Sequence, residues 1–271
     1  MALLLALALA GCGTPEVRRE TVVTTRDRLP GTPEESLVRM GDSMRDGGDL
    51  NGAAQFYGAA VARNATNTAA LVKLGDTELA LGDTARAEGT FRAAVAASPG
   101  SREASIGLGV TLLARGDAAG ALPVLEPAAR ASRDPRVLRN YGVALDLLGR
   151  QAEAQAAYRR GLASSPADPD LHANLALSLA ISGDLAGAQN EVGTAVNMPN
   201  APERVRINQV MLLAMAGRTV DAQAAGRHLA DPSGAGPLIE RGERAKAAMD
   251  PAGRAAALGL VIAQPLQAPP S

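Results

Sequence analysis

The sequence predicts an all-α protein in which helix pairs stack side by side into an elongated solenoid. Six glycines recur at intervals of 34, 34, 33, 34 and 34 residues, and an alanine follows each of them by five positions. A period near 34 residues is typical of a helix–turn–helix repeat whose units bury apolar surface against their neighbours. The chain has only two Phe, three Tyr and no Trp in 271 residues, which suits small interlocking units better than one large core. The glycines are Gly48, Gly82, Gly116, Gly149, Gly183 and Gly217, and the alanines are Ala53, Ala87, Ala121, Ala154, Ala188 and Ala222.

Small and bulky residues recur at fixed distances from each glycine. If that glycine is position 15 of its unit, position 8 is small in most units and position 24 is bulky. We expect the small residue to let paired helices approach closely, while the bulky one fills the next gap. Position 8 holds Gly41, Gly75, Gly109, Gly142, Ala176 and Val210, and position 24 holds Tyr57, Phe91, Leu125, Tyr158, Val192 and Gly226.

The periodic glycine also marks the boundary between the two helices of a unit. A left-handed residue is favoured just after a helix, and glycine adopts that conformation without strain. An aspartate follows the glycine in four units, where it can cap the second helix: Asp49, Asp83, Asp117 and Asp184. Arg150 and Arg218 replace it in the other two units, so we expect weaker caps there.

These columns, together with Pro99 and Pro166 at position 32, resemble the tetratricopeptide repeat. The resemblance implies a right-handed α-solenoid of about six units with a C-terminal cap. The cap would contain two helices, over 237–248 and 252–263. The predicted units are 34–67, 68–101, 102–134, 135–168, 169–202 and 203–234, followed by capping helices in 235–263 and a disordered tail in 264–271.

The N-terminus predicts a lipid anchor. Residues 2–10 are all Ala or Leu, a run too short to span a bilayer but suited to a signal peptide. The sequence Leu-Ala-Gly-Cys at residues 9–12 resembles a bacterial lipobox, which implies cleavage after residue 11 and lipidation of Cys12. Residues 12–33 would then be a flexible tether. Gly13 lacks the acidic character of an inner-membrane retention signal, which favours the periplasmic face of the outer membrane.

Composition argues against several other classes of function. A net charge of −1 gives no basic field for nucleic acid. One Cys and two His provide neither an internal disulfide nor a Cys–His metal cluster, so we expect no metal and no cofactor. The sequence contains no recognisable catalytic motif, and we expect no enzyme activity. A hydrolase that uses Ser with His172 or His228 is the alternative of another class.

In proteins with this repeat, ligands usually lie in a concave groove that the first helices line. The corresponding positions here are mainly apolar in the middle and at the C-terminal end, which suits an amphipathic helix or an apolar peptide. Asn at position 6 of three units either bonds a bound peptide or serves helix packing. The predicted groove residues are Val72, Lys73, Leu79, Ile106, Val110, Leu113, Arg139, Asn140, Val143, Leu147, Asn174, Leu177, Ile181, Ile207, Asn208 and Met211.

The last unit carries a more specific resemblance. Residues 204–209, Arg-Val-Arg-Ile-Asn-Gln, followed by Gly217-Arg218 and Ala222, are similar to a run in the TadD-like lipoproteins of tight-adherence (Tad/Flp) pilus machines. Gln209 replaces the family's Leu. The resemblance implies a pilotin-like role in which a secretin subunit is bound and carried to the outer membrane. The alternative is a lipoprotein that regulates cell-wall synthesis or outer-membrane protein assembly.

Overall fold

A computed structural model describes residues 32–259, which contain fourteen α-helices, one short 3₁₀-helix and no strand. The predicted all-α solenoid is confirmed. The helices are α1 (Pro33–Asp46), α2 (Leu50–Arg63), α3 (Thr68–Ala80), α4 (Thr84–Ala97), α5 (Arg102–Ala114), α6 (Ala118–Ala131), α7 (Pro135–Leu147), α8 (Gln151–Ser164), α9 (Pro169–Ser182), α10 (Leu185–Val196), α11 (Glu203–Met215), α12 (Thr219–Gly226), η2 (Pro232–Gly234), α13 (Ala235–Ala247) and α14 (Pro251–Leu258). The predicted signal peptide, Cys12, the tether up to residue 31 and the tail lie outside the described residues, whereas Thr32 and Pro33, predicted as the end of the tether, cap and begin α1.

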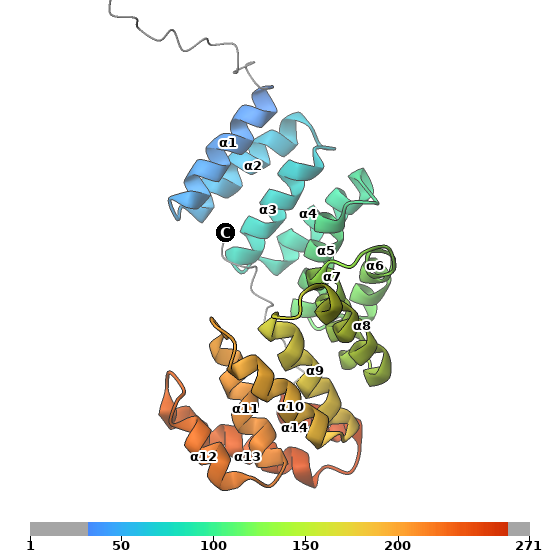
Figure 1. Cartoon of the computed structure of the whole chain (residues 1–271). Helices are drawn as coiled ribbons and strands as arrows, with labels where there is room; N and C mark the ends of the chain where they lie inside the picture. The colour runs from blue at the N-terminus through green and yellow to red at the C-terminus, as the bar shows by residue number, and fades with distance from the viewer. Residues whose placement is uncertain (1–31, 260–271) are drawn as a thin grey trace, which may run out of the picture.

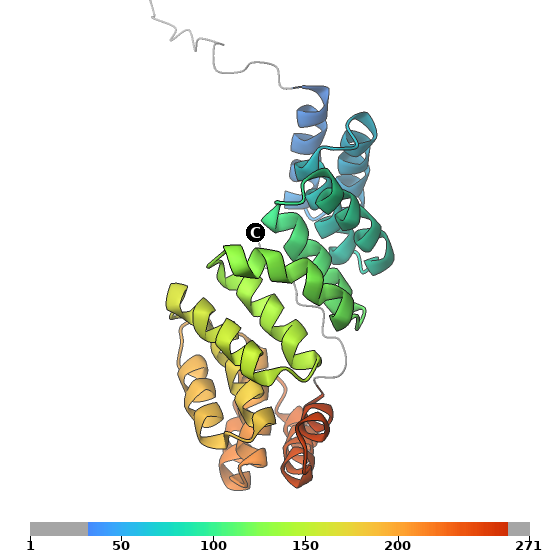
Figure 2. The ribbon, with the colours of Figure 1, turned by 90° about the vertical axis from the view of Figure 1, so that its right-hand side faces the viewer.

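The first twelve helices form six hairpins that follow one another along the chain (Figure 1). Within each hairpin the two helices pack together, and the second helix packs against the first helix of the next hairpin. Figure 2 shows the hairpins stacked in chain order. From α3 to α11, each first helix also contacts the next first helix, so these helices line one continuous face.

The boundaries inside each hairpin follow from the periodic glycine and the residue after it. All six glycines have positive φ, between 75° and 98°. The four aspartates accept a hydrogen bond from the backbone N–H three residues later, at 2.7–3.0 Å, and so cap their helices as predicted. Arg150 and Arg218 make no cap bond. Instead, each pairs at 2.7 Å with an acidic residue three positions on, Glu153 and Asp221.

Size complementarity holds the two helices of a unit together. A Cβ added to any of the four position-8 glycines would lie only 2.3–2.7 Å from the position-24 side chain of the same unit. In the fifth unit, Ala176 accompanies the smaller Val192, and in the sixth the order is reversed, with Val210 and Gly226. The small residue thus makes the space that the bulky one fills, because protein interiors are close-packed.

Helix α6 differs from the other second helices. It contains Pro123 and Pro127 beyond its first turn. Proline donates no N–H, so the carbonyls of Ala119 and Pro123 lack the donor four residues later. The loop after α6 has three residues, one fewer than the loops after α2, α4 and α8. This missing residue accounts for the single 33-residue interval.

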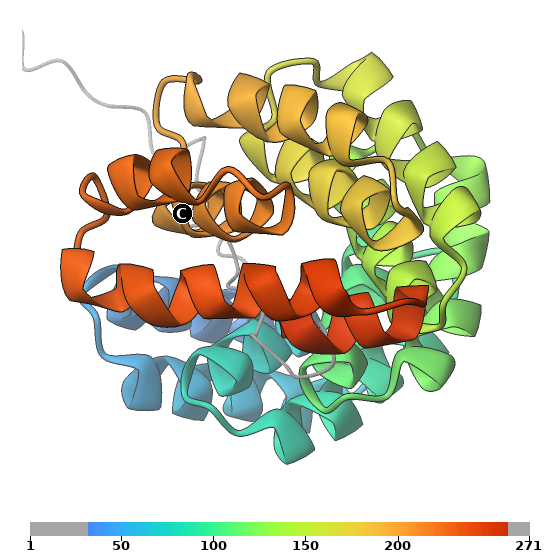
Figure 3. The ribbon, with the colours of Figure 1, turned by 90° about the horizontal axis from the view of Figure 1, so that it is seen from below.

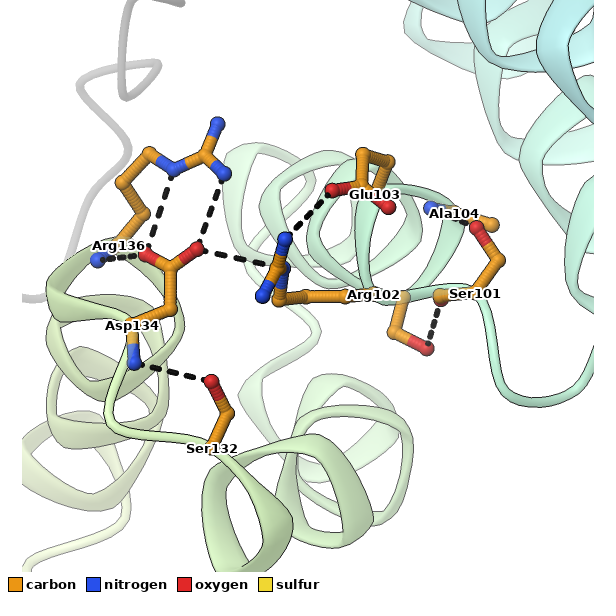
Figure 4. A network of polar contacts seen from close by, with 8 residues as sticks. Ser101, Arg102, Glu103, Ala104, Ser132, Asp134 and Arg136 are labelled. Atoms are coloured by element: carbon orange, nitrogen blue, oxygen red, sulfur yellow. Dashed lines mark hydrogen bonds and ion pairs between the residues drawn. The ribbon is translucent and has the colours of Figure 1, made fainter.

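A polar network joins the third and fourth units at the start of their first helices (Figure 4). The Asp134 carboxylate accepts from the backbone N–H of Arg136 at 2.9 Å and pairs with its guanidinium at 3.0 Å. Arg102 of α5 approaches the same carboxylate at 3.3 Å. Burial would raise the pKa of Asp134, but these bonds and charges hold it below its usual value. The network therefore ties α5 to α7 across the repeat boundary.

The C-terminal helices do not simply extend the row of hairpins. Helix α13 packs mainly against α11, the first helix of the last unit, and α14 contacts α9. Figure 3 shows them crossing the lower end of the array. Sequence patterns predicted a cap over the open end, but the two helices also cover the first helices of the last two units. Helix α14 is shorter than expected, because it ends at left-handed Gly259.

Candidate groove on the first helices

The central part of the first-helix row presents an uncovered apolar strip, which we call the open stretch. It consists of Val72 and Leu79 on α3, Ile106 and Val110 on α5, and Val143 and Leu147 on α7. All are partly exposed, and Leu147 is 36% exposed. Leu113, also predicted to line the groove, is 5% exposed and belongs to the core beneath it. Six aliphatic side chains on three successive, contacting helices are thus at least partly exposed, and Asp76 of α3 shares the column of Val110 and Val143.

The C-terminal part of the same row is covered. Leu177, Ile181 and Met211 are 7%, 1% and 4% exposed, in a cluster that includes Ala245 of α13 and Leu258 of α14. The cover comes from α13 and α14, the helices of the predicted cap. Ile207, partly buried, packs against the same cluster. A partner that needs these residues must first displace the C-terminal helices.

Two small residues and two arginines explain why α13 and α14 fit there. A Cβ on Gly242 would lie 2.3 Å from the Met211 carbonyl oxygen, so only glycine lets α13 sit directly on α11. Ala245 is fully buried beside it. The Arg254 Nε donates to the Ile181 carbonyl at 2.7 Å, which satisfies an acceptor at the end of α9. Arg241 donates to the Leu258 carbonyl and links α13 to α14.

Both cationic residues predicted for the groove already have partners. Lys73 Nζ binds the Asp42 carboxylate at 2.6 Å and lies 5.9 Å from the centre of the Tyr57 ring. Arg139 binds Asp170 of α9 at 3.0 Å, and Arg204 of α11 pairs with the same carboxylate. These contacts bridge successive units. Their first role is therefore to hold the stack together.

Acidic side chains border the open stretch at its N-terminal end. Position 9, which is Val110 and Val143 in the middle of the array, is Asp42 in α1 and Asp76 in α3. Burial raises the pKa of Asp76 to about 6, although Arg45 and Lys73 oppose that shift. Asp76 could have been recognised from the sequence, because it occupies a repeat position that is apolar in the two units that follow.

A second polar group lies at the boundary between the fourth and fifth units. Asp146 of α7 accepts a bond from the Tyr158 hydroxyl at 2.9 Å and one from the Ser178 hydroxyl at 2.7 Å. Burial raises the pKa of Asp146 to about 7, and the two hydroxyl bonds only partly oppose this. Tyr158 and Ser178 are buried in α8 and α9, so the carboxylate joins three helices.

The asparagines at position 6 do not form one uniform row. Asn140 is 2% exposed and its side-chain oxygen has no hydrogen-bond partner among residues 32–259, whereas Asn174 and Asn208 are partly exposed. A buried oxygen without a hydrogen-bond donor destabilises the fold. A small movement of the neighbouring side chains would let a hydrogen-bond donor reach the Asn140 oxygen. Whether the other two bind a peptide stays a prediction.

The two histidines differ in their surroundings. His172 Nδ1 contacts Glu191 at 2.6 Å and Nε2 contacts the Pro166 carbonyl at 3.0 Å, so both ring nitrogens serve the connection between α9 and its neighbours. His228 lies after α12 and is exposed. None of the helices between residues 32 and 259 is long and apolar enough to cross a bilayer.

Comparison with known proteins agrees with this architecture. Sequence models of the tetratricopeptide repeat match residues 38–102 and 148–202, 78–140, and 135–160. Together these matches run from residue 38 to residue 202, more than half of the chain. The chain belongs to the tetratricopeptide-repeat family. No curated protein sequence matches it.

Solved structures of tetratricopeptide-repeat proteins share the fold at low sequence identity. PilW, described as a widely conserved type IV pilus biogenesis factor, has a TM-score of 0.63 and 19% identity over 70% of this chain and 90% of its own. MamA from Desulfovibrio magneticus RS-1 has a TM-score of 0.56 and 22% identity over 61% of this chain and 94% of its own. YrrB, described as having an unusual peptide-binding site, has 0.54 and 18% over 67% and 90%. At such identities these likenesses show the fold alone.

Proposed function

We propose that this protein is a lipid-anchored adaptor of the bacterial envelope that binds an apolar segment of a protein partner on the open stretch. The observation that carries the proposal is the uncovered strip of aliphatic side chains on α3, α5 and α7. Contiguous exposed apolar surface is a feature of interaction sites in soluble domains. A partner helix or extended segment would bury this strip and gain hydrophobic free energy.

The partner we propose is an outer-membrane secretin subunit of a Tad/Flp-type pilus machine. The run at residues 204–209 supports it through its resemblance to TadD-like lipoproteins, and the fold shared with the pilus biogenesis factor PilW is consistent with it. In this proposal, lipidated Cys12 holds the complex at the periplasmic face of the outer membrane, while the repeats hold the secretin segment.

The binding half of the proposal is tested with a charge placed on the open stretch. Val143→Glu should lower capture of the purified secretin subunit by about tenfold or more, because a buried unpaired carboxylate opposes binding. Ala156→Glu is the matched control, since Ala156 is exposed on α8, the second helix of the same unit. Equal capture by both variants, with unchanged circular dichroism, would refute binding at this site.

The anchoring half is tested separately with Cys12→Ser. Membrane fractionation should then find the protein released in soluble form, and secretin multimers should no longer reach the outer membrane. Normal multimers in this variant would exclude the pilotin-like role but leave binding on the open stretch intact.

A further inference from the structure

The C-terminal helices approach the open stretch step by step. Along the chain, α13 lies on α11 and α14 lies on α9, so each element covers the first helix one unit closer to the N-terminus. The next first helix in this direction is α7, which carries Val143 and Leu147 of the open stretch. Leu258, at the end of α14, is 2% exposed within the core cluster that includes Leu177 and Ile181. The described chain therefore ends against α9, in a cluster onto which Val143 of the open stretch also packs.

The residues that follow have the chemistry of that strip. Residues 260–263 read Leu-Val-Ile-Ala, and residues 260–271 contain no charged side chain. The nearest part of the open stretch is aliphatic too, with partly exposed Val143 and Leu147 on α7 and Val110 on α5. Burial of aliphatic groups against one another is favourable without any requirement for charge pairing.

The distance is short enough for a contact within one molecule. Packed helices lie about 8–10 Å apart, which sets the step from α9 to α7. Four extended residues span about 13 Å. Residues 260–263 can therefore reach α7 from the end of α14 without any rearrangement of α13 or α14.

We propose that residues 260–263 bind in cis to the α7 end of the open stretch, with their aliphatic side chains against Val143 and Leu147. The protein thus carries its own competitor for the site, and a partner binds by displacing this segment. This last clause rests on the proposed function, whereas the contact in cis does not. The partner segment that fits is of the same kind, a short uncharged aliphatic stretch.

Disulfide trapping in the full chain tests the contact. In a Cys12→Ser background, which removes the only native thiol, the pair Leu147→Cys and Ile262→Cys is compared with Ala156→Cys and Ile262→Cys. Both positions on the repeats are exposed, so neither change disturbs the core. The first pair should form a disulfide within one molecule about tenfold faster or more, because bound segments have a high effective concentration.

A second measurement uses the reactivity of the site. In the same background, Leu147→Cys alone is alkylated with and without Leu260, Val261 and Ile262 all changed to Ser. If the segment covers the site about nine-tenths of the time, its removal speeds alkylation about tenfold. Equal disulfide rates at both positions, or unchanged alkylation, would overturn the proposal. Disulfide-linked dimers would overturn it as well, because a second copy would then supply the segment. Neither readout involves a partner, so both are independent of secretin capture.

Discussion

Replacing Gly109 with Ala probes the contact that sets helix spacing within a unit. The new Cβ would lie 2.5 Å from Leu125 Cδ2 and 2.6 Å from its Cγ. Overpacking of this kind costs about 1–3 kcal/mol, while the better helix propensity of Ala returns about 1 kcal/mol. We therefore expect Gly109→Ala to lower the free energy of unfolding by up to about 2 kcal/mol. Urea denaturation followed by circular dichroism measures it.

Two further variants separate the effect of the Cβ contact with Leu125 from the effect of the higher helix propensity of Ala. Gly89→Ala in α4 adds its Cβ to open space, so it should stabilise the protein by about 0.5–1 kcal/mol. Adding Leu125→Val to Gly109→Ala rebuilds the Ala176 and Val192 pair of the fifth unit. The double variant should be about 1–2 kcal/mol more stable than the two single changes predict. Strict additivity, or a gain from Gly109→Ala equal to that from Gly89→Ala, would refute size complementarity as the cause of the spacing.

Three further outcomes follow from other contacts. Asp146 binds a proton more readily in the folded state, so its contribution to stability is greatest at low pH and is lost as pH rises from about 4 to about 7. The melting temperature of Asp146→Asn relative to the wild type should therefore rise as pH increases across that range. A difference in melting temperature that does not change with pH would contradict the raised pKa. Ala154→Leu, at a fully buried position, should cost about 1–3 kcal/mol by overpacking, and unchanged melting would count against the repeat alignment. Asp117→Ala should cost about 1 kcal/mol through loss of the bond to the Gly120 N–H, measured by denaturant titration, and no loss would mean that the cap is dispensable.

Contacts within one repeat were predictable because they depend on residues at fixed short separations. The left-handed glycines, the aspartate caps and the filling of position 24 all follow from local backbone geometry and side-chain size. Recurrence of the glycine and alanine in six units made the pattern visible even where single positions vary.

Contacts between distant elements were not predictable in the same way. The sequence of residues 235–258 does not predict that Gly242 contacts Met211 of α11 rather than α12. A small residue permits a close approach between helices but does not specify which helix approaches. Lys73 and Arg139 face the groove by position, yet each binds an acid on a neighbouring unit. Asp146 looked like an ordinary polar residue, since its environment comes from Tyr158 and Ser178 of two other helices.

The two prolines of α6 affect how this protein unfolds. In a linear array each unit is supported only by its immediate neighbours, so where α6 is weak the two halves are joined mainly by the contacts between α5 and α7. Helix α6 lacks two of its own backbone bonds and sits between the N-terminal hairpins and the half that α13 and α14 secure. Amide hydrogens of α6 should exchange first among the internal helices, and partial unfolding should separate the molecule there into two cooperative blocks. Mechanical pulling or limited proteolysis would find the same breaking point.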